Sequence, residues 1–263
     1  MDYLLETRNI TKHFGGLTAV DHVSVGLRAG EALAVLGDNG AGKSTLIKII
    51  SGVHRPDEGE IYIGGKAVRI ESPMDALAAG IETIYQDLAL AENLDVGANI
   101  FLGRERMRRS LGILRVLDDQ SMREEAQKVL DRLDIEIPSL KKTIRTLSGG
   151  QRQAVAISRP IYWDVKVLIM DEPTAALGVA EQKKVLNLVR TLKGQGIGII
   201  IISHQMYDVF EVADRLAVMR RGLLVGERVV KETTPDEVVG LIVGSETVGK
   251  ERQEGRTAET AEE

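Results

Sequence analysis

Residues 31–51 are EALAVLGDNGAGKSTLIKIIS, in which a short apolar run leads into a glycine-rich turn and a second apolar run. The first run has the length of a buried strand, and the segment from Lys43 to Ser51 is typical of a helix that a glycine, Gly52, closes. The turn from Gly37 to Ser44 matches the pattern G-x-x-x-x-G-K-[ST] in the strand-turn-helix context that this pattern requires. Its glycines let backbone amides curl around phosphate oxygens, and the helix N-terminus adds a favourable dipole. The stretch therefore predicts a phosphate-binding loop.

A nucleotide is the expected ligand of this loop. Lys43 is expected to neutralise the β- and γ-phosphates, and Ser44 to ligate Mg²⁺. The residues expected to contact the nucleotide here are Gly37, Asn39, Gly40, Ala41, Gly42, Lys43, Ser44 and Thr45. An accidental glycine-rich turn is the alternative, and the flanking strand and helix argue against it.

Apolar runs and helical patterns alternate along the rest of the chain, which indicates an α/β fold with a largely parallel sheet. Core strands are expected at residues 166–170, 197–202 and 215–219. A second, antiparallel β layer is expected from residues 4–14, 18–28, 60–63 and 66–70. Residues 93–162 turn helical, with an amphipathic stretch at 119–133, and predict an inserted helical subdomain.

These patterns predict a single domain at residues 1–244. It comprises a RecA-like core with the β layer, residues 1–92 and 163–244, and the helical subdomain, residues 93–162. Residues 245–263 have almost no apolar side chains and predict a disordered tail.

Composition excludes several classes of protein. The chain has 263 residues, no cysteine and a net charge of −5. Disulfides, cysteine-ligated zinc and thiol catalysis are therefore excluded, and the acidic balance argues against a nucleic-acid coat. No apolar segment approaches the length of a membrane span, so a membrane connection is expected only through a partner.

A second apolar strand, residues 167–170, ends in two carboxylates, Asp171 and Glu172. Parallel sheets bind ligands at the carboxyl ends of their strands, where a Mg²⁺-nucleotide site needs carboxylates. We expect Asp171 to hold Mg²⁺, usually through water, and Glu172 to act as the general base toward the attacking water. The alternative is a solvated helix start, where acidic residues are common.

Residues 147–151, LSGGQ, resemble the signature peptide of the ABC ATPases and lie 20 residues before Asp171, as in that family. The resemblance covers roughly residues 3–243 and includes Gln86 in the position of the Q-loop and His204 after a strand. It implies that Gln86 contacts Mg²⁺ or the attacking water, that His204 contacts the γ-phosphate, and that Phe14 stacks on adenine. For Phe14, a plain core position stays open.

The family resemblance also implies how two copies cooperate. ATP bound at Lys43 of one copy is expected to contact the signature of the other copy, through Ser148, Gly149, Gly150 and Gln151. The helix N-terminus behind the signature would face the γ-phosphate. The resemblance therefore implies a homodimer that closes on ATP and opens after hydrolysis. The catalytic residues that it implies are Lys43, Gln86, Glu172 and His204.

Several sequence segments resemble those of ATP-binding subunits of bacterial carbohydrate importers of the ribose, xylose and fructose type, in the single-cassette form. These are residues 37–45, 101–105, 175–178 and 203–206. The resemblance implies a membrane permease as partner, a periplasmic sugar-binding protein as indirect partner, and a place on the cytoplasmic face of the inner membrane. Residues 14–20 also resemble branched-chain amino-acid importers, so import of another substrate, an exporter motor and a soluble ABC switch stay open as alternatives.

Three features depart from the pattern or lie outside it. Gly178 stands where the family usually has an aspartate, and Pro160 predicts a kink or an end in the helix after the signature. One basic cluster is formed by Arg104, Arg106, Arg108, Arg109 and Arg115. It lacks the interleaved aromatic residues of a nucleic-acid surface, so no nucleic-acid partner is expected, and a loop facing the permease or anionic lipid is favoured.

Overall fold

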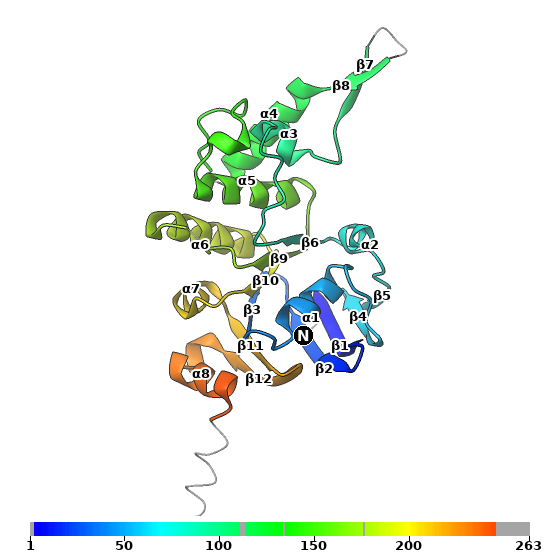
Figure 1. Ribbon diagram of the computed structural model, residues 1–263. Coiled ribbons are helices and arrows are strands. Elements are labelled where there is room, and N and C mark those ends of the chain that lie inside the picture. Colours follow the sequence, from blue (N-terminus) through cyan, green and yellow to red (C-terminus); the bar gives the residue numbers. More distant parts are fainter. Residues whose placement is uncertain (1–2, 111–113, 134, 176, 246–263) are drawn as a thin grey trace, which may run out of the picture.

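The computed structural model describes residues 3–110, 114–133, 135–175 and 177–245 (Figure 1). Its centre is a six-stranded sheet in the order β12-β11-β3-β10-β9-β6. Every pair of neighbours is parallel except β11 and β12. The strands are β3 (Ala32–Leu36), β6 (Ile81–Ile84), β9 (Val167–Asp171), β10 (Gly198–Ile202), β11 (Arg215–Arg220) and β12 (Leu223–Val229).

Burial on both faces explains why β9 and β10 are continuous apolar runs instead of alternating patterns. Ile169 and Ile200 pack toward one side, with α1 (Lys43–Ile50) and the second sheet. Met170 and Ile201 pack toward the other side, with α6 (Val179–Gly194). A third cluster joins β3 and β11 to α7 (Met206–Val212) and α8 (Pro235–Val243).

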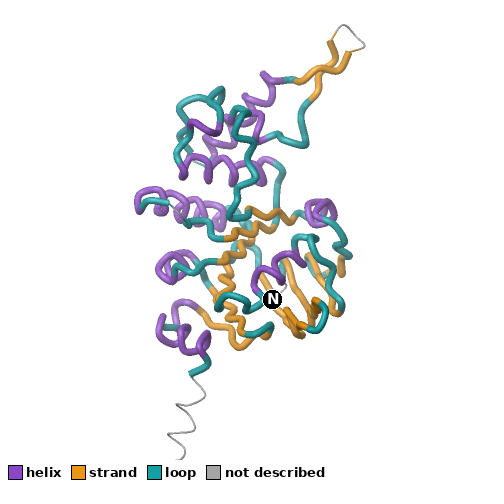
Figure 2. Tube along the Cα trace, in the orientation of Figure 1, coloured by secondary structure: helices purple, strands orange, loops and turns teal. Residues whose placement is uncertain are grey.

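The second sheet is antiparallel, in the order β2-β1-β4-β5, and confirms the predicted β layer (Figures 1 and 2). Its strands are β1 (Leu5–Phe14), β2 (Leu17–Leu27), β4 (Glu58–Ile63) and β5 (Lys66–Val68). Apolar residues of α1 pack with both sheets, which holds the start of this helix at the edge of the core. The short α2 (Pro73–Ala78) precedes β6, and the 3-10 turn η2 (Val230–Glu232) follows β12.

The segment between β6 and β9 contains α3 (Val96–Ile100), α4 (Asp119–Arg132), the 3-10 turn η1 (Ile144–Thr146) and α5 (Gly149–Tyr162). These elements have a hydrophobic cluster of their own around the fully buried Phe101. The ring of Phe101 lies 4.5 Å from that of Tyr162 between centroids. Helix α5 continues through Pro160 and ends two residues later.

The wholly helical reading of this segment is wrong at one place. Residues of β7 (Met107–Ser110) and β8 (Leu114–Leu117) form an antiparallel two-stranded ribbon. Each strand has only four residues, and neither alternates regularly between apolar and polar side chains, so the sequence carries no clear strand pattern there. Residues 246–263, where the disordered tail is expected, lie outside the described part of the chain. Among the described residues, no helix combines the length and the apolar character needed to cross a membrane.

Candidate nucleotide-binding site

The phosphate loop joins β3 to α1, as the sequence predicts. Gly37 has φ 145° and Gly42 has φ 102°, and backbone packs tightly against both. A Cβ on Gly37 would lie 2.1 Å from the carbonyl oxygen of Met219, and one on Gly42 would lie 2.4 Å from that of Ala19. Gly40 also has positive φ, 79°, but has open space around it. Two glycines are therefore required by packing, while Gly40 leaves the loop open at its outer side.

The Lys43 side chain turns back into the loop. Its amine donates hydrogen bonds to the carbonyl oxygens of Gly37 at 2.6 Å and Asp38 at 2.9 Å, and the residue is 6% exposed. Burial lowers the pKa of Lys43, and nearby Glu172, Asp38 and Asp171 partly offset that shift. Of the other loop residues, Ala41 is buried, Thr45 is half-buried, and Asn39 and Ser44 are exposed.

Asp171 and Glu172 stand at the end of β9, beside the phosphate loop. Burial raises the pKa of both carboxyl groups, and Lys43 and His204 partly offset the shift at Asp171. Glu172 has φ 51°, a left-handed conformation that costs a non-glycine residue free energy. Its amide donates to the carbonyl oxygen of Ile202 at 2.8 Å, which ties it to β10.

His204 follows β10 and faces Glu172. Its Nε2 atom lies 3.4 Å from Oε1 of Glu172. Oε1 of Glu172 is buried and has no hydrogen-bond partner among the described residues. A buried carboxylate oxygen without a hydrogen-bond partner, close to an imidazole and in electrostatic interaction with Lys43, can accept a proton.

Gln86 lies on the same cavity as Glu172. The cavity measures about 260 Å³, and its lining includes Gly149, Arg152 and Leu177. It therefore joins the segment after β6, the start of α5 and the end of β9. The structure thus brings Lys43, Asp171, Glu172 and His204 into one group and places Gln86 at its edge.

The signature residues form the start of α5. Ser148 is the N-cap: its hydroxyl accepts from the Gln151 amide at 3.3 Å, and the Gln151 side chain accepts from the Ser148 amide at 3.1 Å. The Gly150 amide donates to Oε1 of Glu181 in α6 at 3.3 Å. Helix α5 belongs to the helical segment, whereas α1 lies against the sheets (Figure 1). Sequence reasoning gave no role to Glu181, because its contact with Gly150 is between helices.

Phe14 ends β1 and is 45% exposed, so the alternative of a plain core position is wrong. Its ring meets the ring of His54 edge-on, with centroids 5.3 Å apart. The Lys12 ammonium lies 5.7 Å from the ring centroid. His54 was not singled out by the sequence, since only the packing of the loop after α1 brings it to Phe14.

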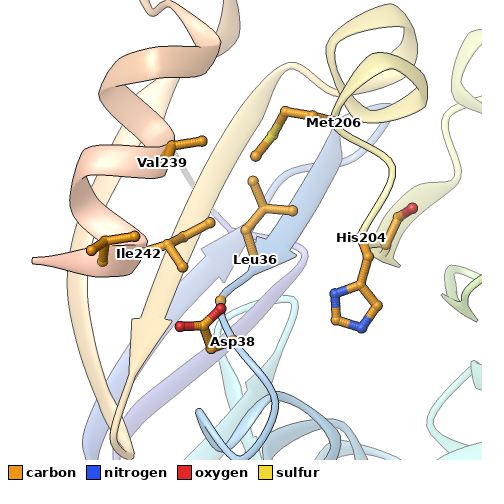
Figure 3. Close-up of a pocket in the computed structure, with 9 residues that line it drawn as sticks. Leu36, Asp38, His204, Met206, Val239 and Ile242 are labelled. Carbon is orange, nitrogen blue, oxygen red and sulfur yellow. The ribbon is translucent and has the colours of Figure 1, made fainter.

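A second cavity, of about 250 Å³, has His204 in its lining (Figure 3). Val239 and Ile242 of α8 face Leu36 and Met206 across it, and Asp38 and His204 add polar side chains to its lining. Its apolar wall is continuous with the cluster that holds α7 and α8 to the sheet. Of the described residues, none form a cluster of three or more His, Asp or Glu placed to hold a metal ion.

The fold and this site define the class of P-loop nucleoside triphosphatases. A family model described as ABC transporter matches residues 20–175. The xylose/arabinose import ATP-binding protein of Sulfolobus acidocaldarius is 47% identical over 256 residues, which cover 96% of this chain and 100% of that protein. The fructose import ATP-binding protein of Rhizobium meliloti is 45% identical over 253 residues, 94% of this chain and 96% of that protein.

A solved structure agrees with these relatives. The nucleotide-free ATP-binding cassette of an ABC transporter superposes with a TM-score of 0.79 at 30% identity, covering 92% of this chain and 98% of the other. The chain belongs to the ABC transporter family, as its ATP-binding, ATP-hydrolysing cassette. The resemblance inferred from the signature and the phosphate loop is confirmed.

Proposed function

We propose that this cassette is the motor subunit of a sugar importer. The observation that supports a hydrolytic motor most directly is the buried, unpartnered Glu172 carboxylate oxygen 3.4 Å from His204, beside Lys43. The sugar assignment is supported by relatives named for xylose, arabinose and fructose import at 45–47% identity. Which sugar is carried depends on the permease and the binding protein, which touch it.

Each residue of the group has a role in the proposed reaction. Lys43 exchanges its two loop carbonyl contacts for the β- and γ-phosphates of ATP. Glu172 accepts a proton from the attacking water, for which its raised pKa is suited. His204 holds Glu172 and contacts the γ-phosphate, and Gln86 positions the water from the cavity that it shares with Glu172. Phe14, exposed at the end of β1, stacks on adenine.

The residues present fit a magnesium ion. Ser44 offers an exposed hydroxyl next to Lys43, and Asp171 offers a half-buried carboxylate that interacts electrostatically with Lys43. Hydroxyl, carboxylate and carboxamide oxygens are hard ligands of the kind Mg²⁺ takes, and phosphates and water complete its shell, so no cluster of three acidic residues is needed. Ser44, Asp171 and Gln86 are the proposed ligands. When bound, Mg²⁺ neutralises charge on the β- and γ-phosphates.

Two copies are proposed to act together. The signature stands on the helical segment, apart from the phosphate loop of its own chain, with its amides at a helix N-terminus. Such amides bind anions. Ser148, Gly149, Gly150 and Gln151 of one copy are proposed to contact the γ-phosphate held by Lys43 of another, so that ATP closes a homodimer and hydrolysis opens it.

The dimer is proposed to drive a membrane permease on the cytoplasmic face of the inner membrane, supplied by a periplasmic sugar-binding protein. The groove for the permease is placed between the Gln86 segment and the helical segment, where the cavity of about 260 Å³ lies. A nucleotide-dependent change in that groove would reach both the permease and Glu172, because Glu172 lines it as well.

The proposal is tested with Glu172→Gln, which keeps the size of the side chain and removes the base. The variant should bind ATP, dimerise with it and hydrolyse it very slowly. In a pull-down from solubilised source membranes with ATP, it should recover a polytopic permease, whose identity narrows the sugar. Lys43→Ala, which should not bind ATP, is the matched control. Recovery of soluble proteins alone, with dimerisation intact, would contradict the importer assignment.

A further inference from the structure

The ribbon of β7 and β8 projects from the helical segment away from both sheets (Figures 1 and 2). Within the described residues, its two strands pack extensively only against each other. An isolated two-stranded ribbon is marginally stable in water, and a further surface is needed to stabilise it. The ribbon is therefore expected to rest on something outside this chain.

The five arginines of the basic cluster divide into two groups. Arg104 lies over the Trp163 ring, 4.6 Å from its centroid. Arg106 donates to Oγ of Ser121 at 3.1 Å and to the Tyr162 hydroxyl. These two brace the base of the ribbon. The other three, Arg108, Arg109 and Arg115, are exposed, and no described residue forms an ion pair or a hydrogen bond with their side chains.

One face of the ribbon combines charge with apolar surface. Arg109 pairs directly with Arg115 across the two strands, and Met107 pairs with Leu117 two positions away. Side chains two positions apart share a face, so these four residues lie on the same side. Met107 is 44% exposed and Leu117 is 49% exposed. Like charges directly opposite each other destabilise a ribbon, unless an anionic partner neutralises them.

Exposed arginines beside exposed apolar side chains favour a lipid surface over other anionic partners. Guanidinium groups bind phosphates in bidentate geometry, and arginine can keep its head at a membrane surface while its stem and apolar neighbours enter the headgroup boundary. The described ribbon residues include no aromatic side chain for stacking on bases. Because the chain as a whole carries a net charge of −5, an anionic membrane would attract the ribbon and repel the rest.

We propose that the β7–β8 ribbon binds anionic lipid headgroups through Arg109 and Arg115, with Met107 and Leu117 at the headgroup boundary. The ribbon is then a second membrane attachment beside the permease, and it orients the helical segment toward the bilayer. The biological setting rests on the proposed importer function, but lipid binding is a property of the ribbon alone. The lipid-binding proposal and the importer proposal can therefore be refuted independently of each other.

The test is flotation of the full chain, without permease, on vesicles of phosphatidylcholine with or without phosphatidylglycerol. The chain should float only with phosphatidylglycerol, and high salt should release it. Each arginine should contribute about a fivefold preference, so Arg109→Glu with Arg115→Glu should weaken binding by about 25-fold or more. Arg109→Lys with Arg115→Lys should retain most of it. Lys66→Glu with Lys183→Glu makes the same charge change at exposed sites elsewhere and should bind like the wild type.

Equal flotation of the wild type and the Arg109/Arg115 double-glutamate variant would overturn the proposal. If that variant also loses the permease in the pull-down, the ribbon is a protein contact instead. The ATPase rate of the double-glutamate variant in solution should equal that of the wild type, since no ribbon residue lies in the nucleotide site. A wild type that floats but does not hydrolyse ATP would refute the motor function and leave the lipid contact standing.

Discussion

The Glu181 carboxylate accepts a hydrogen bond from the Gly150 amide at 3.3 Å, so an anionic side chain occupies the N-terminus of the signature helix. Cβ and Cγ of Glu181 lie against Gly150, at 3.0 Å from the position that a Cβ would take. Contacts with Ser148 and Gly150 lower the pKa of Glu181, so the group is ionised at neutral pH. It stands where the proposed dimer places the γ-phosphate of a second copy.

We predict that Glu181→Gln promotes ATP-dependent dimerisation. The substitution removes a negative charge that competes with phosphate for the Gly150 amide, so half-maximal dimerisation should need a few-fold less ATP. Analytical size exclusion of the Glu172→Gln protein, with and without the second change, measures this. Lys183→Gln, at an exposed position of the same helix without a signature contact, is the control. Unchanged or weaker dimerisation would show that Glu181 does not compete with nucleotide.

Glu172→Gln should lower the ATPase rate by roughly 10²–10⁴-fold while ATP binding persists, as expected on loss of a general base. Steady-state hydrolysis and fluorescent-nucleotide titration measure the two quantities separately. A loss of rate that comes with an equal loss of ATP binding would instead make Glu172 a binding residue.

The pH profile reports on the contact between His204 and Glu172. The base must be deprotonated, and burial raises the pKa of Glu172, so the wild-type rate should fall as the pH drops through that raised value. His204 lowers this pKa, so His204→Ala should raise it and move the acid limb of the profile to higher pH. His22→Ala, a histidine in the antiparallel sheet, should leave the limb in place. A limb that moves to lower pH in His204→Ala would contradict the assignment.

Gly37→Ala and Gly40→Ala should differ in stability. A Cβ at Gly37 would collide with the Met219 carbonyl at 2.1 Å, so the free energy of unfolding should fall by about 3 kcal/mol or more. At Gly40 the cost is the left-handed conformation alone, about 1–2 kcal/mol. Urea unfolding of both variants gives the comparison. Equal losses would mean that the loop is not held by its packing against Met219.

Phe14→Ala should weaken ATP binding by roughly 1–3 kcal/mol, the usual contribution of a base stacked on an aromatic ring. Because the ring is 45% exposed, stability should change by no more than about 0.5 kcal/mol. Leu17→Ala alters the residue paired with Phe14 across the β1–β2 turn. This control should change neither the free energy of ATP binding nor that of unfolding by more than about 0.5 kcal/mol. If stability falls and affinity does not, Phe14 is a structural residue only.

Sequence patterns predicted the parts of the fold that depend on near neighbours. The phosphate loop, β9 with its two carboxylates, and α4 were expected within a residue or two of where they lie. The ribbon was not predicted, because its strands have only four residues each and show no regular alternation of polar and apolar side chains. Helix α7 was not predicted either, because Gln205 before it makes no side-chain cap hydrogen bond and gives no helix-start pattern.

Within the site, too, the sequence predicts the features that depend on adjacent residues and not those that depend on distant ones. The residue types around Lys43, Asp171 and Glu172 predict a nucleotide site by themselves, and the resemblance to the ABC ATPases adds the roles of Ser148 and His204. This works because a phosphate loop, a carboxylate after a strand and a helix cap are each built from adjacent residues. Their chemistry is therefore encoded locally.

Only the tertiary structure decided which groups share a cavity, which groups are buried, and which side chain competes with phosphate for the Gly150 amide. The Glu181 contact with Gly150, the exposure of Phe14 beside His54, and the unpartnered Glu172 oxygen all depend on side chains brought together from separate elements. Burial shifts the pKa values of Lys43 and Glu172, and it arises only when the sheets and helices close around them. Contacts between residues distant in sequence depend on the packing of the whole core, and no local pattern records them.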